Sequence, residues 1–333
     1  MFNKRRISFL MLCVMLLVVF TGCGKTEVAD NQKGDKKYSV VCTIFPEYDW
    51  VCQILGDSRD KFDITLLLDN GVDLHSYQPT AEDIAKISAC DLFVYVGGES
   101  DKWVEDALKE ASNPDMQVIN LIETLGAGVK EEELVEGMED EAEEHGDGAE
   151  DEEEAEYDEH VWLSLKNACI LVEEIAEKLG QTDIENADLY KANCTAYKEK
   201  LVALDEEYKS TIDLAKYKTI LFGDRFPFRY LVDDYGLDYY AAFAGCSAET
   251  EASFDTIIFL AGKVDELGLK SIMIIDGSDD KLAKTIVDNT SGKNQQILAL
   301  DSMQSTTMKD INDGKNYILA MESNLEVLKQ ALN

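Results

Sequence analysis

The chain has 333 residues, of which 45% are hydrophobic, and its formal net charge is −36 at pH 7. This length is enough for two globular domains, each with its own hydrophobic core. The negative charge excludes a nucleic acid as the expected partner, because binding a polyanion requires a basic surface that releases counterions. A cationic ligand such as a metal ion fits this charge better.

The first residues have the order of a secretion signal. Basic residues at positions 4 to 6 precede an apolar run from Ile7 to Phe20, which is too short for a good membrane span. Thr21-Gly22-Cys23 follows, and small residues directly before a cysteine resemble the lipobox of bacterial lipoproteins. We therefore expect a signal peptide over 1–22, a lipid on Cys23 that attaches the chain to the outside of the bacterial cell membrane, and a flexible tether over 23–37. A cleaved signal beside an incidental cysteine is the alternative.

Six further cysteines follow this region. Export permits disulfides, but the six form neither a Cys-x-x-Cys pair nor a dense framework. Most have apolar neighbours, so we interpret them as small buried hydrophobic side chains, and the sequence does not give any pairing. They are Cys42, Cys52, Cys90, Cys169, Cys194 and Cys246.

Residues 38–180 are assigned to an N-terminal α/β lobe. Short β-rich runs alternate there with helical stretches, as in βαβ units around a parallel sheet. No Gly-x-Gly-x-x-Gly or Walker A sequence follows a predicted strand, so nucleotide binding is not indicated. The predicted strands are Tyr38–Phe45, Phe62–Leu68, Leu92–Val96 and Gln117–Leu121, and the predicted helices are Glu47–Leu55, Thr80–Ser88 and Lys102–Glu110.

Residues 126–158 form an acidic stretch within this lobe. They contain glycines and almost no aromatic residues, and no Lys or Arg occurs between Glu131 and Glu159. This composition predicts a solvated insertion loop. His145 lies in its middle and is either incidental or helps to collect cations.

Two helical patterns follow the acidic stretch. The first covers Leu163–Leu179 and is expected to end at Gly180. The second, within 181–215, contains neither Gly nor Pro after Asp183. A helix of this length spans roughly 45–50 Å, which is enough to link two lobes.

Residues 216–333 repeat the alternation of strands and helices and are assigned to a C-terminal α/β lobe. The predicted fold is thus α/β, with two lobes of parallel-type sheets joined by one long rigid helix. Ligands of such sheets bind outside the carboxyl ends of the strands, which here means the cleft between the lobes. The predicted strands are Thr219–Gly223, Tyr239–Ala244, Ser271–Asp276 and Gln296–Leu300, and the predicted helices are Pro227–Tyr235, Ser253–Leu267, Lys281–Asn289 and Asn316–Leu332.

Three residues are candidate metal ligands. His75 follows the second predicted strand, His160 lies between the acidic stretch and a helix, and Asp276 closes an apolar strand. Two imidazoles and a carboxylate suit Zn²⁺ or Mn²⁺. Each also has a simpler explanation, since a loop histidine is often a surface or capping residue and an aspartate after a strand often caps a helix. The usual metallohydrolase and calcium-loop motifs are absent from the sequence.

Four motifs together resemble one family. They are His75-Ser76-Tyr77-Gln78-Pro79-Thr80, Asp158-Glu159-His160-Val161-Trp162-Leu163-Ser164, Tyr190-Lys191-Ala192-Asn193 and Glu251-Ala252-Ser253. They are similar to the His-x-Tyr-x-Pro, Asp-x-His-x-Trp-Leu, linking-helix and Glu-Pro-Ser segments of the zinc and manganese ABC transporter substrate-binding lipoproteins, the ZnuA-like or cluster A-I group. Ala252 stands where that family has proline.

The resemblance implies a ligand set with one departure. His75 and His160 would be the ligands from the N-terminal lobe and Asp276 the final acidic ligand. The position of the third family ligand falls on Arg225, which stays protonated and has no lone pair for a metal. The site would then use three protein ligands, use Asp224, or recruit another donor such as His145 or a loop carboxylate. Alternatively Arg225 pairs a carboxylate or an anion, or forms a turn ion pair with Asp224.

The implied function is that of an extracytoplasmic protein which captures a divalent transition metal and delivers it to an ABC transporter permease. We expect zinc because the acidic stretch contains His145, although two histidines with oxygen ligands would also suit Mn²⁺ or Fe²⁺. We expect no enzyme activity, a monomer, and contact with the membrane only through the lipid. A secreted metal-dependent hydrolase is the alternative. A surface adhesin is a third possibility that no sequence feature indicates.

Overall fold

The computed structural model describes residues 37–138, 157–247 and 251–333. The predicted signal peptide, Cys23, nearly all of the tether, and His145 lie outside these residues, so the expectations for them stay predictions. Within the described residues, no helix combines the length and apolar character that crossing a membrane requires. The six described cysteines are free thiols.

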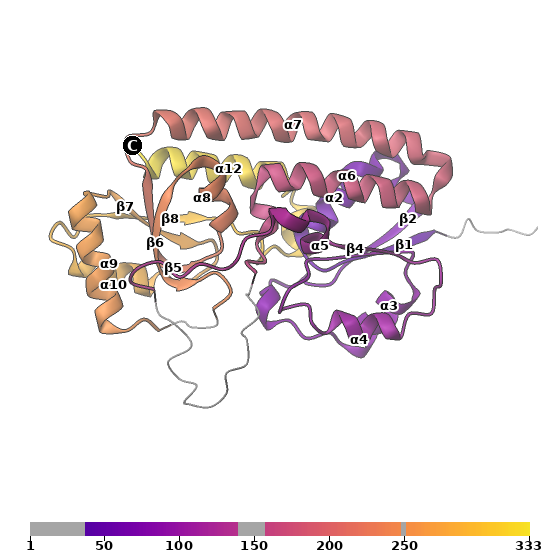
Figure 1. Cartoon of the computed structure of the whole chain (residues 1–333), viewed down its shortest axis with the longest axis horizontal. Coiled ribbons are helices and arrows are strands. Elements are labelled where there is room, and N and C mark those ends of the chain that lie inside the picture. The colour runs from indigo at the N-terminus through magenta and orange to yellow at the C-terminus, as the bar shows by residue number, and fades with distance from the viewer. Residues whose placement is uncertain (1–36, 139–156, 248–250) are drawn as a thin grey trace, which may run out of the picture. The chain divides into compact units, whose positions relative to one another are not determined.

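Two four-stranded parallel sheets form the framework, as predicted (Figure 1). Their strand orders are equivalent, β2-β1-β3-β4 and β6-β5-β7-β8. In each sheet the first strand along the chain lies second in the sheet, the next strand is added on one side of it, and the last two are added on the other side. Continuous runs of apolar residues, many of them β-branched or aromatic, explain most of these strands, because helices cover both faces of a parallel sheet. The strands are β1 (Tyr38–Cys42), β2 (Phe62–Leu66), β3 (Leu92–Tyr95), β4 (Gln117–Asn120), β5 (Thr219–Phe226), β6 (Asp238–Ala244), β7 (Ser271–Ile275) and β8 (Gln296–Leu300).

Helices surround both sheets, and side-chain caps fix where several of them begin. Thr80 accepts from the backbone N–H of Asp83, whose carboxylate accepts in return from the Thr80 N–H (2.9 Å). The hydroxyl of Ser164 accepts from the Asn167 N–H (3.0 Å) at the start of the helix Leu165–Thr182. The helices are α2 (Phe45–Leu55), α3 (Ala81–Ala89), α4 (Val104–Lys109), α5 (Leu121–Leu125), α6 (Leu165–Thr182), α7 (Ala187–Leu214), α8 (Arg229–Tyr235), α9 (Phe254–Leu267), α10 (Lys281–Asn289), α11 (Met308–Asn312) and α12 (Tyr317–Ala331).

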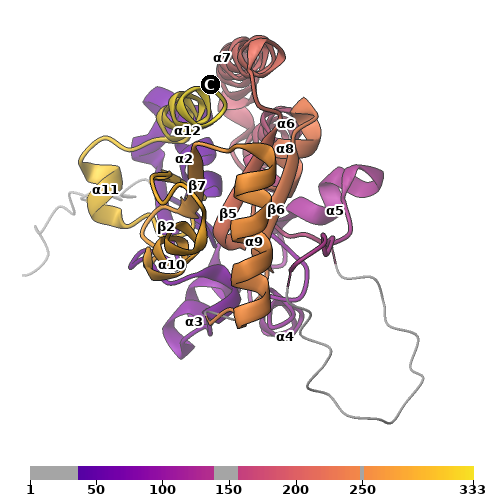
Figure 2. The same ribbon diagram turned by 90° about the vertical axis from the view of Figure 1, so that its left-hand side faces the viewer.

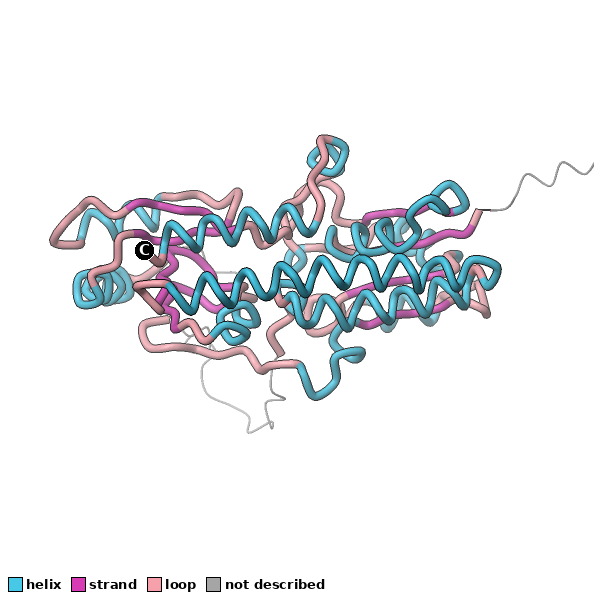
Figure 3. Tube along the Cα trace, turned by 90° about the horizontal axis from the view of Figure 1, so that it is seen from above, coloured by secondary structure: helices cyan, strands magenta, loops and turns pink. Residues whose placement is uncertain are grey.

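Helix α7 has 28 residues and runs along both lobes, as the uninterrupted helical pattern predicted (Figures 1 and 3). The predicted segment was slightly too long at its start, where a separate short turn covers Ile184–Asn186. Helix α12 also links the lobes, which the sequence did not indicate. Its Tyr317 donates through its N–H to Asp49 (3.1 Å) and through its hydroxyl to the carbonyl of Trp162 (2.6 Å).

The hydrophobic core follows this arrangement. One cluster of buried residues extends from Val40 in β1 through α6, α7 and α12 to Phe222 in β5. A second cluster lies where α9 and α10 cover the other face of the second sheet (Figure 2), and it includes Leu260 and Ile286. The strand ends between the lobes are therefore held by core that is continuous from one sheet to the other.

Three predictions about local structure were wrong. Helix α6 continues through Gly180 to Thr182, and Gly180 lies within the helix where an added Cβ would be 3.1 Å from the Cβ of Ala187. Helices α5 and α11 were missed, since five residues are too few to show a helical period. Strand β5 extends beyond Gly223 to Phe226, with a break in register after Phe222.

The expectation of a solvated loop over 126–158 was also wrong for its described ends. Val135 and Met138 pack against the core, and Glu131 pairs with Tyr157 in an isolated β-bridge. Glu133 forms an ion pair with Arg229 (2.8 Å). The prediction failed because Val135 and Met138 are isolated apolar residues among many acidic ones, so they show no periodic pattern.

Gly223 lies where β5 touches α10, and it offers a test of this packing. A Cβ at position 223 would approach the Cα of Ala283 to 2.7 Å, so we expect Gly223→Ala to lower the free energy of unfolding by about 1–3 kcal/mol. Urea unfolding followed by circular dichroism measures this change. Gly262→Ala is the matched control, because that glycine lies exposed within α9 with nothing near its Cβ, and it should stabilise the protein by up to about 1 kcal/mol. Equal effects of the two substitutions would contradict the close contact.

Candidate metal centre

His75 lies in a single helical turn, Leu74–Ser76, in the segment after β2. Its backbone N–H donates to the carboxylate of Asp73 (3.0 Å). Its ring Nδ1 lies 2.7 Å from the hydroxyl of Ser100 and 3.4 Å from a carboxylate oxygen of Glu159. These partners occupy Nδ1 and leave Nε2 facing His160.

His160 is fully buried at the join between the lobes. One carboxylate oxygen of Asp158 lies 2.8 Å from the backbone nitrogen of His160 and 3.0 Å from its ring Nδ1. The carbonyl of Asp158 accepts in turn from the hydroxyl of Tyr230 in the second lobe (2.8 Å). The Nε2 atoms of His75 and His160 lie only 3.2 Å apart. A carboxylate behind each imidazole is the arrangement that orients histidine ligands in metal sites.

Cys246 is a third donor that the sequence prediction missed. Its sulfur and the histidine nitrogens all lie within 4.8 Å of one another, and they make up the group of donor side chains in the described chain that is close enough to hold an ion. The apolar neighbours of Cys246 in the sequence predict only a small buried hydrophobic side chain. A signal was present, because Cys246 lies two positions after β6, the second strand of its lobe in chain order, as His75 follows β2, the second strand of the other lobe.

The thiol of Cys246 is surrounded by carboxylates. Its own backbone N–H donates to Glu132 (2.9 Å). Burial raises the pKa of the thiol, and the negative charges of Glu132 and Asp158 raise it further. The thiol is therefore protonated until a cation replaces its proton.

Arg225 does not pair with Asp224, so the predicted turn ion pair is wrong. The Arg225 guanidinium donates to Asp73 (2.8 Å) across the cleft and to the carbonyl of Ser247 (3.3 Å). Burial would raise the pKa of Asp73, but Arg225 outweighs this effect and holds the pKa below its usual value. The sequence alternative in which Arg225 pairs a carboxylate is the one observed.

The two predicted acidic ligands lie apart from the histidines. Asp224 accepts through one carboxylate oxygen from the Arg225 N–H (2.8 Å) and through the other from the Ile275 N–H (3.0 Å), so it joins β5 to β7. Asp276 follows β7 as predicted, but it is exposed and is not part of the donor group. Its backbone is bonded to Leu300 (2.8 Å) in the adjacent strand, and the chain turns there toward solvent. A ligand role for either residue stays a prediction.

Two small cavities meet at His75. One of about 290 Å³ extends past Asp73 and Arg225 toward the second lobe. The other, of about 240 Å³, is lined by Ser100, Glu159 and Cys246 among others. The donor group is therefore reached by space on both sides of the His75 ring.

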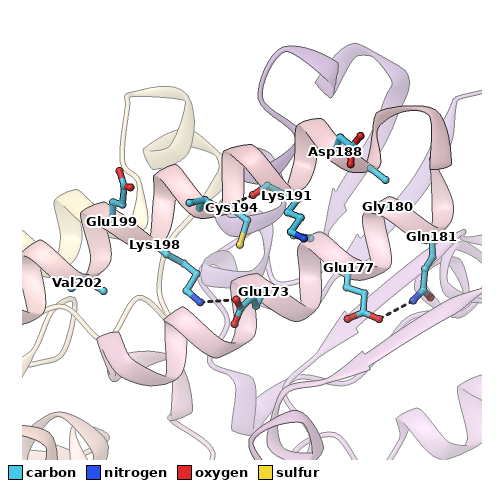
Figure 4. A pocket seen from close by; sticks show the side chains of 13 residues that line it. Glu173, Glu177, Gly180, Gln181, Asp188, Lys191, Cys194, Lys198, Glu199 and Val202 are labelled. Atoms are coloured by element: carbon cyan, nitrogen blue, oxygen red, sulfur yellow. Dashed lines mark hydrogen bonds and ion pairs between the residues drawn. The ribbon is translucent and has the colours of Figure 1, made fainter.

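A wider cavity of about 860 Å³ lies elsewhere, between α6 and α7 (Figure 4). Its walls are helix-surface side chains that bond to one another, such as Lys198 to Glu173 (2.8 Å) and Gln181 to Glu177 (3.2 Å). Cys194 in its wall donates to the carbonyl of Val172 (3.5 Å). No histidine lines it, so the candidate centre is the one between the lobes.

A comparison with protein families decides the relationship of the chain. A family model described as "Zinc-uptake complex component A periplasmic" (ZnuA) matches residues 40–331. The chain belongs to the ZnuA family. The resemblance drawn from the four sequence motifs is thereby confirmed.

Individual members agree with this assignment. High-affinity zinc uptake system protein ZnuA of Bacillus subtilis (strain 168) is 32% identical over 332 residues, covering 100% of this chain and 99% of the relative. Zinc-binding lipoprotein AdcA of Streptococcus pneumoniae serotype 4 (strain ATCC BAA-334 / TIGR4) is 32% identical over 329 residues; the match covers 98% of this chain but spans only 61% of AdcA. The crystal structure of the Zn(II)-bound ZnuA-like domain of S. pneumoniae AdcA has a TM-score of 0.67 and 29% identity, covering 89% of this chain and 99% of that domain.

Buried acids lie behind the histidines in this ZnuA-family chain. Burial would raise the pKa of Glu159, but bonds with His75 and Ser100 outweigh burial and lower it. Asp101 has no such partner for its Oδ1 atom, and Oδ2 accepts from the Gly97 N–H (3.0 Å). Burial therefore raises the pKa of Asp101 to about 7, with a further contribution from the charge of Glu159. Glu159 supplies fixed negative charge, whereas Asp101 is neutral below pH 7.

The raised pKa of Asp101 predicts a pH dependence of stability. Between the unfolded value of 3.8 and the folded value of about 7, only the folded state binds this proton. Its stabilising contribution, at most about 4 kcal/mol, is fully present below the unfolded pKa and is lost progressively as the pH rises from there through about 7. Asp101→Asn removes the ionisation, so we expect the variant to lose less unfolding free energy than the wild type between pH 5 and pH 8.

Urea unfolding at several pH values measures this difference. Asp115→Asn is the control for loss of a carboxylate, since Asp115 lies in an exposed turn. If Asp101→Asn and the wild type had parallel pH profiles, ionisation of the buried Asp101 would not be the cause.

Proposed function

We propose that this chain captures a zinc ion outside the membrane, between His75 and His160, and delivers it to an ABC transporter permease. The observation that carries the proposal is the 3.2 Å separation of the two Nε2 atoms, with both Nδ1 atoms engaged by other groups. Without a cation, two nitrogens at this distance are compatible only if one ring donates a proton to the other. A cation between them would accept a lone pair from each nitrogen. Neutral imidazole nitrogen is a preferred ligand of zinc.

The surrounding charges support capture of a divalent cation. Asp158 and Glu159 are buried carboxylates within bonding distance of the two rings, so a bound cation is compensated without a counterion. The names of the relatives, a zinc-binding lipoprotein and a zinc uptake protein, support zinc as the cargo. Imidazole nitrogen favours zinc over manganese, which prefers oxygen ligands, and Fe²⁺ is intermediate in affinity.

The predicted lipid anchor and acidic stretch also fit a protein that carries an ion. Cys23 would hold the chain at the outer face of the cell membrane by its lipid, and the chain would act as a monomer. The acidic stretch with His145 would raise the local concentration of cations. The cargo is bound and released without being chemically converted, so the protein acts as a carrier and not as a catalyst. Among the described residues we find no feature that favours the hydrolase or the adhesin.

Titration calorimetry tests the cargo directly. The wild type should bind one zinc ion per chain, more tightly than manganese, and more weakly as the pH is lowered, because protons compete for the imidazole nitrogens. His160→Ala should weaken zinc binding by at least about 100-fold, since it removes a ligand and its fixed orientation. His145→Ala, which alters the third histidine, should bind like the wild type. Absence of measurable zinc binding by the wild type would refute the proposal.

The acidic stretch should matter for rate and not for affinity. Deleting residues 139–154 leaves Glu132 and Glu133 in their contacts with the second lobe. We expect this variant to keep its zinc affinity within about threefold at physiological salt, where charges beyond roughly 8 Å are screened. Stopped-flow measurements at low salt should show slower zinc association, and a loss of affinity as large as that of His160→Ala would contradict a collecting role.

A further inference from the structure

We propose that Cys246 supplies a thiolate ligand to the zinc ion, beside His75 and His160. This inference rests on the function proposed above and adds a ligand from the second lobe. It makes the site a His₂Cys centre with a fourth position open for water or another donor.

Cys246 lies close to both histidines. The residue follows β6 by two positions, its backbone N–H is bonded to Glu132 (2.9 Å), and its sulfur lies within 4.8 Å of a nitrogen on each histidine. Zinc bonds of about 2.0–2.3 Å separate two tetrahedral ligand atoms by roughly 3.5 Å. Only a small inward movement of one side chain therefore gathers the three donors around one ion.

Gly245 allows this approach. A Cβ at position 245 would lie 3.1 Å from Cε1 of the His160 ring and 2.9 Å from the carbonyl oxygen of Phe226. The chain that carries Cys246 thus passes directly against the imidazole. A larger residue would move the thiol away from the histidines.

Arg225 links the segment of His75 to the segment of Cys246. Its guanidinium bonds both to Asp73 and to the carbonyl of Ser247. Asp73 in turn accepts from the backbone N–H of His75, and Ser247 is the residue after Cys246. Arg225, which cannot bind a metal, therefore ties together the two segments that carry His75 and Cys246.

In the described part of the second lobe, no carboxylate or imidazole belongs to the donor group. Both carboxylate oxygens of Asp224 accept backbone N–H groups, and Asp276 is exposed outside the donor group. Among the His, Cys, Asp and Glu side chains of the described part of that lobe, Cys246 is the one in the donor group. The amide oxygen of Gln304 also lies 3.1 Å from Nε2 of His160, but the amide is neutral and its nitrogen bonds to Asp73 (3.3 Å). On binding, the sulfur–proton bond is replaced by a sulfur–zinc bond and the proton passes to solvent, with no change of oxidation state. Thiolate also selects zinc against manganese.

Cobalt substitution tests the ligand directly. Reduced protein loaded with Co²⁺ should show the near-ultraviolet charge-transfer band of a cobalt–thiolate bond. Cys246→Ser should abolish the band and weaken zinc binding at least about tenfold, with little effect on manganese. Cys169→Ser is the matched control, because Cys169 is also a partly buried free thiol but lies on α6, and this variant should keep the band.

Cys246→His separates ligation from packing. It should recover zinc affinity relative to Cys246→Ser while lacking the charge-transfer band. The inference is overturned if Co²⁺ binds the wild type without the band, or if the band persists in Cys246→Ser. If neither Co²⁺ nor Zn²⁺ binds the wild type, the proposed function itself fails. Should Cys246→Ser not fold, the wild-type and Cys169→Ser spectra, with the cadmium-113 chemical shift of the cadmium-loaded wild type, still decide whether sulfur is a ligand.

Discussion

The candidate metal centre depends on the parallel pairing of the strands, because parallel strands have their carboxyl ends at the same edge of the sheet. In both lobes these edges turn toward the cleft, and the segments after β2, β6 and β8 meet there. The polar groups of these segments must bond to one another because little water reaches them. Trp162 donates to the Ser302 carbonyl (2.9 Å) and Tyr230 to the Asp158 carbonyl (2.8 Å), and both bonds join the lobes.

Charge is arranged in two layers around this edge. The imidazoles of His75 and His160 face each other, and the carboxylates of Glu159 and Asp158 lie directly behind them. At the mouth of the cleft the ion pair of Arg225 with Asp73 removes one carboxylate charge from the field. The excess negative charge is thus concentrated behind the donors, where a low dielectric strengthens its attraction for a cation. The overall charge of −36 adds a weaker, salt-sensitive attraction at longer range.

The sequence predicted the strands and the longer helices to within a few residues, because each has a clear period of apolar residues. It also placed His75 correctly after the second strand and His160 before a helix, each within one family motif. It could not predict the partner of Arg225, since Asp73 lies 152 positions away in the other lobe. Asp276 and Cys246 illustrate the same limit. Both follow strands, yet only the turn geometry after each strand decides which side chain faces the cleft.

The three donors His75, His160 and Cys246 come from well-separated parts of the chain. In an unfolded chain, gathering them would require closing two loops of about 85 residues each, at a considerable cost in entropy. An ion that uses all three donors therefore binds the folded chain selectively and adds to its folding free energy by mass action. Loading must follow folding, so a chain that crosses the membrane unfolded arrives without its cargo and gains resistance to unfolding only once the ion is bound.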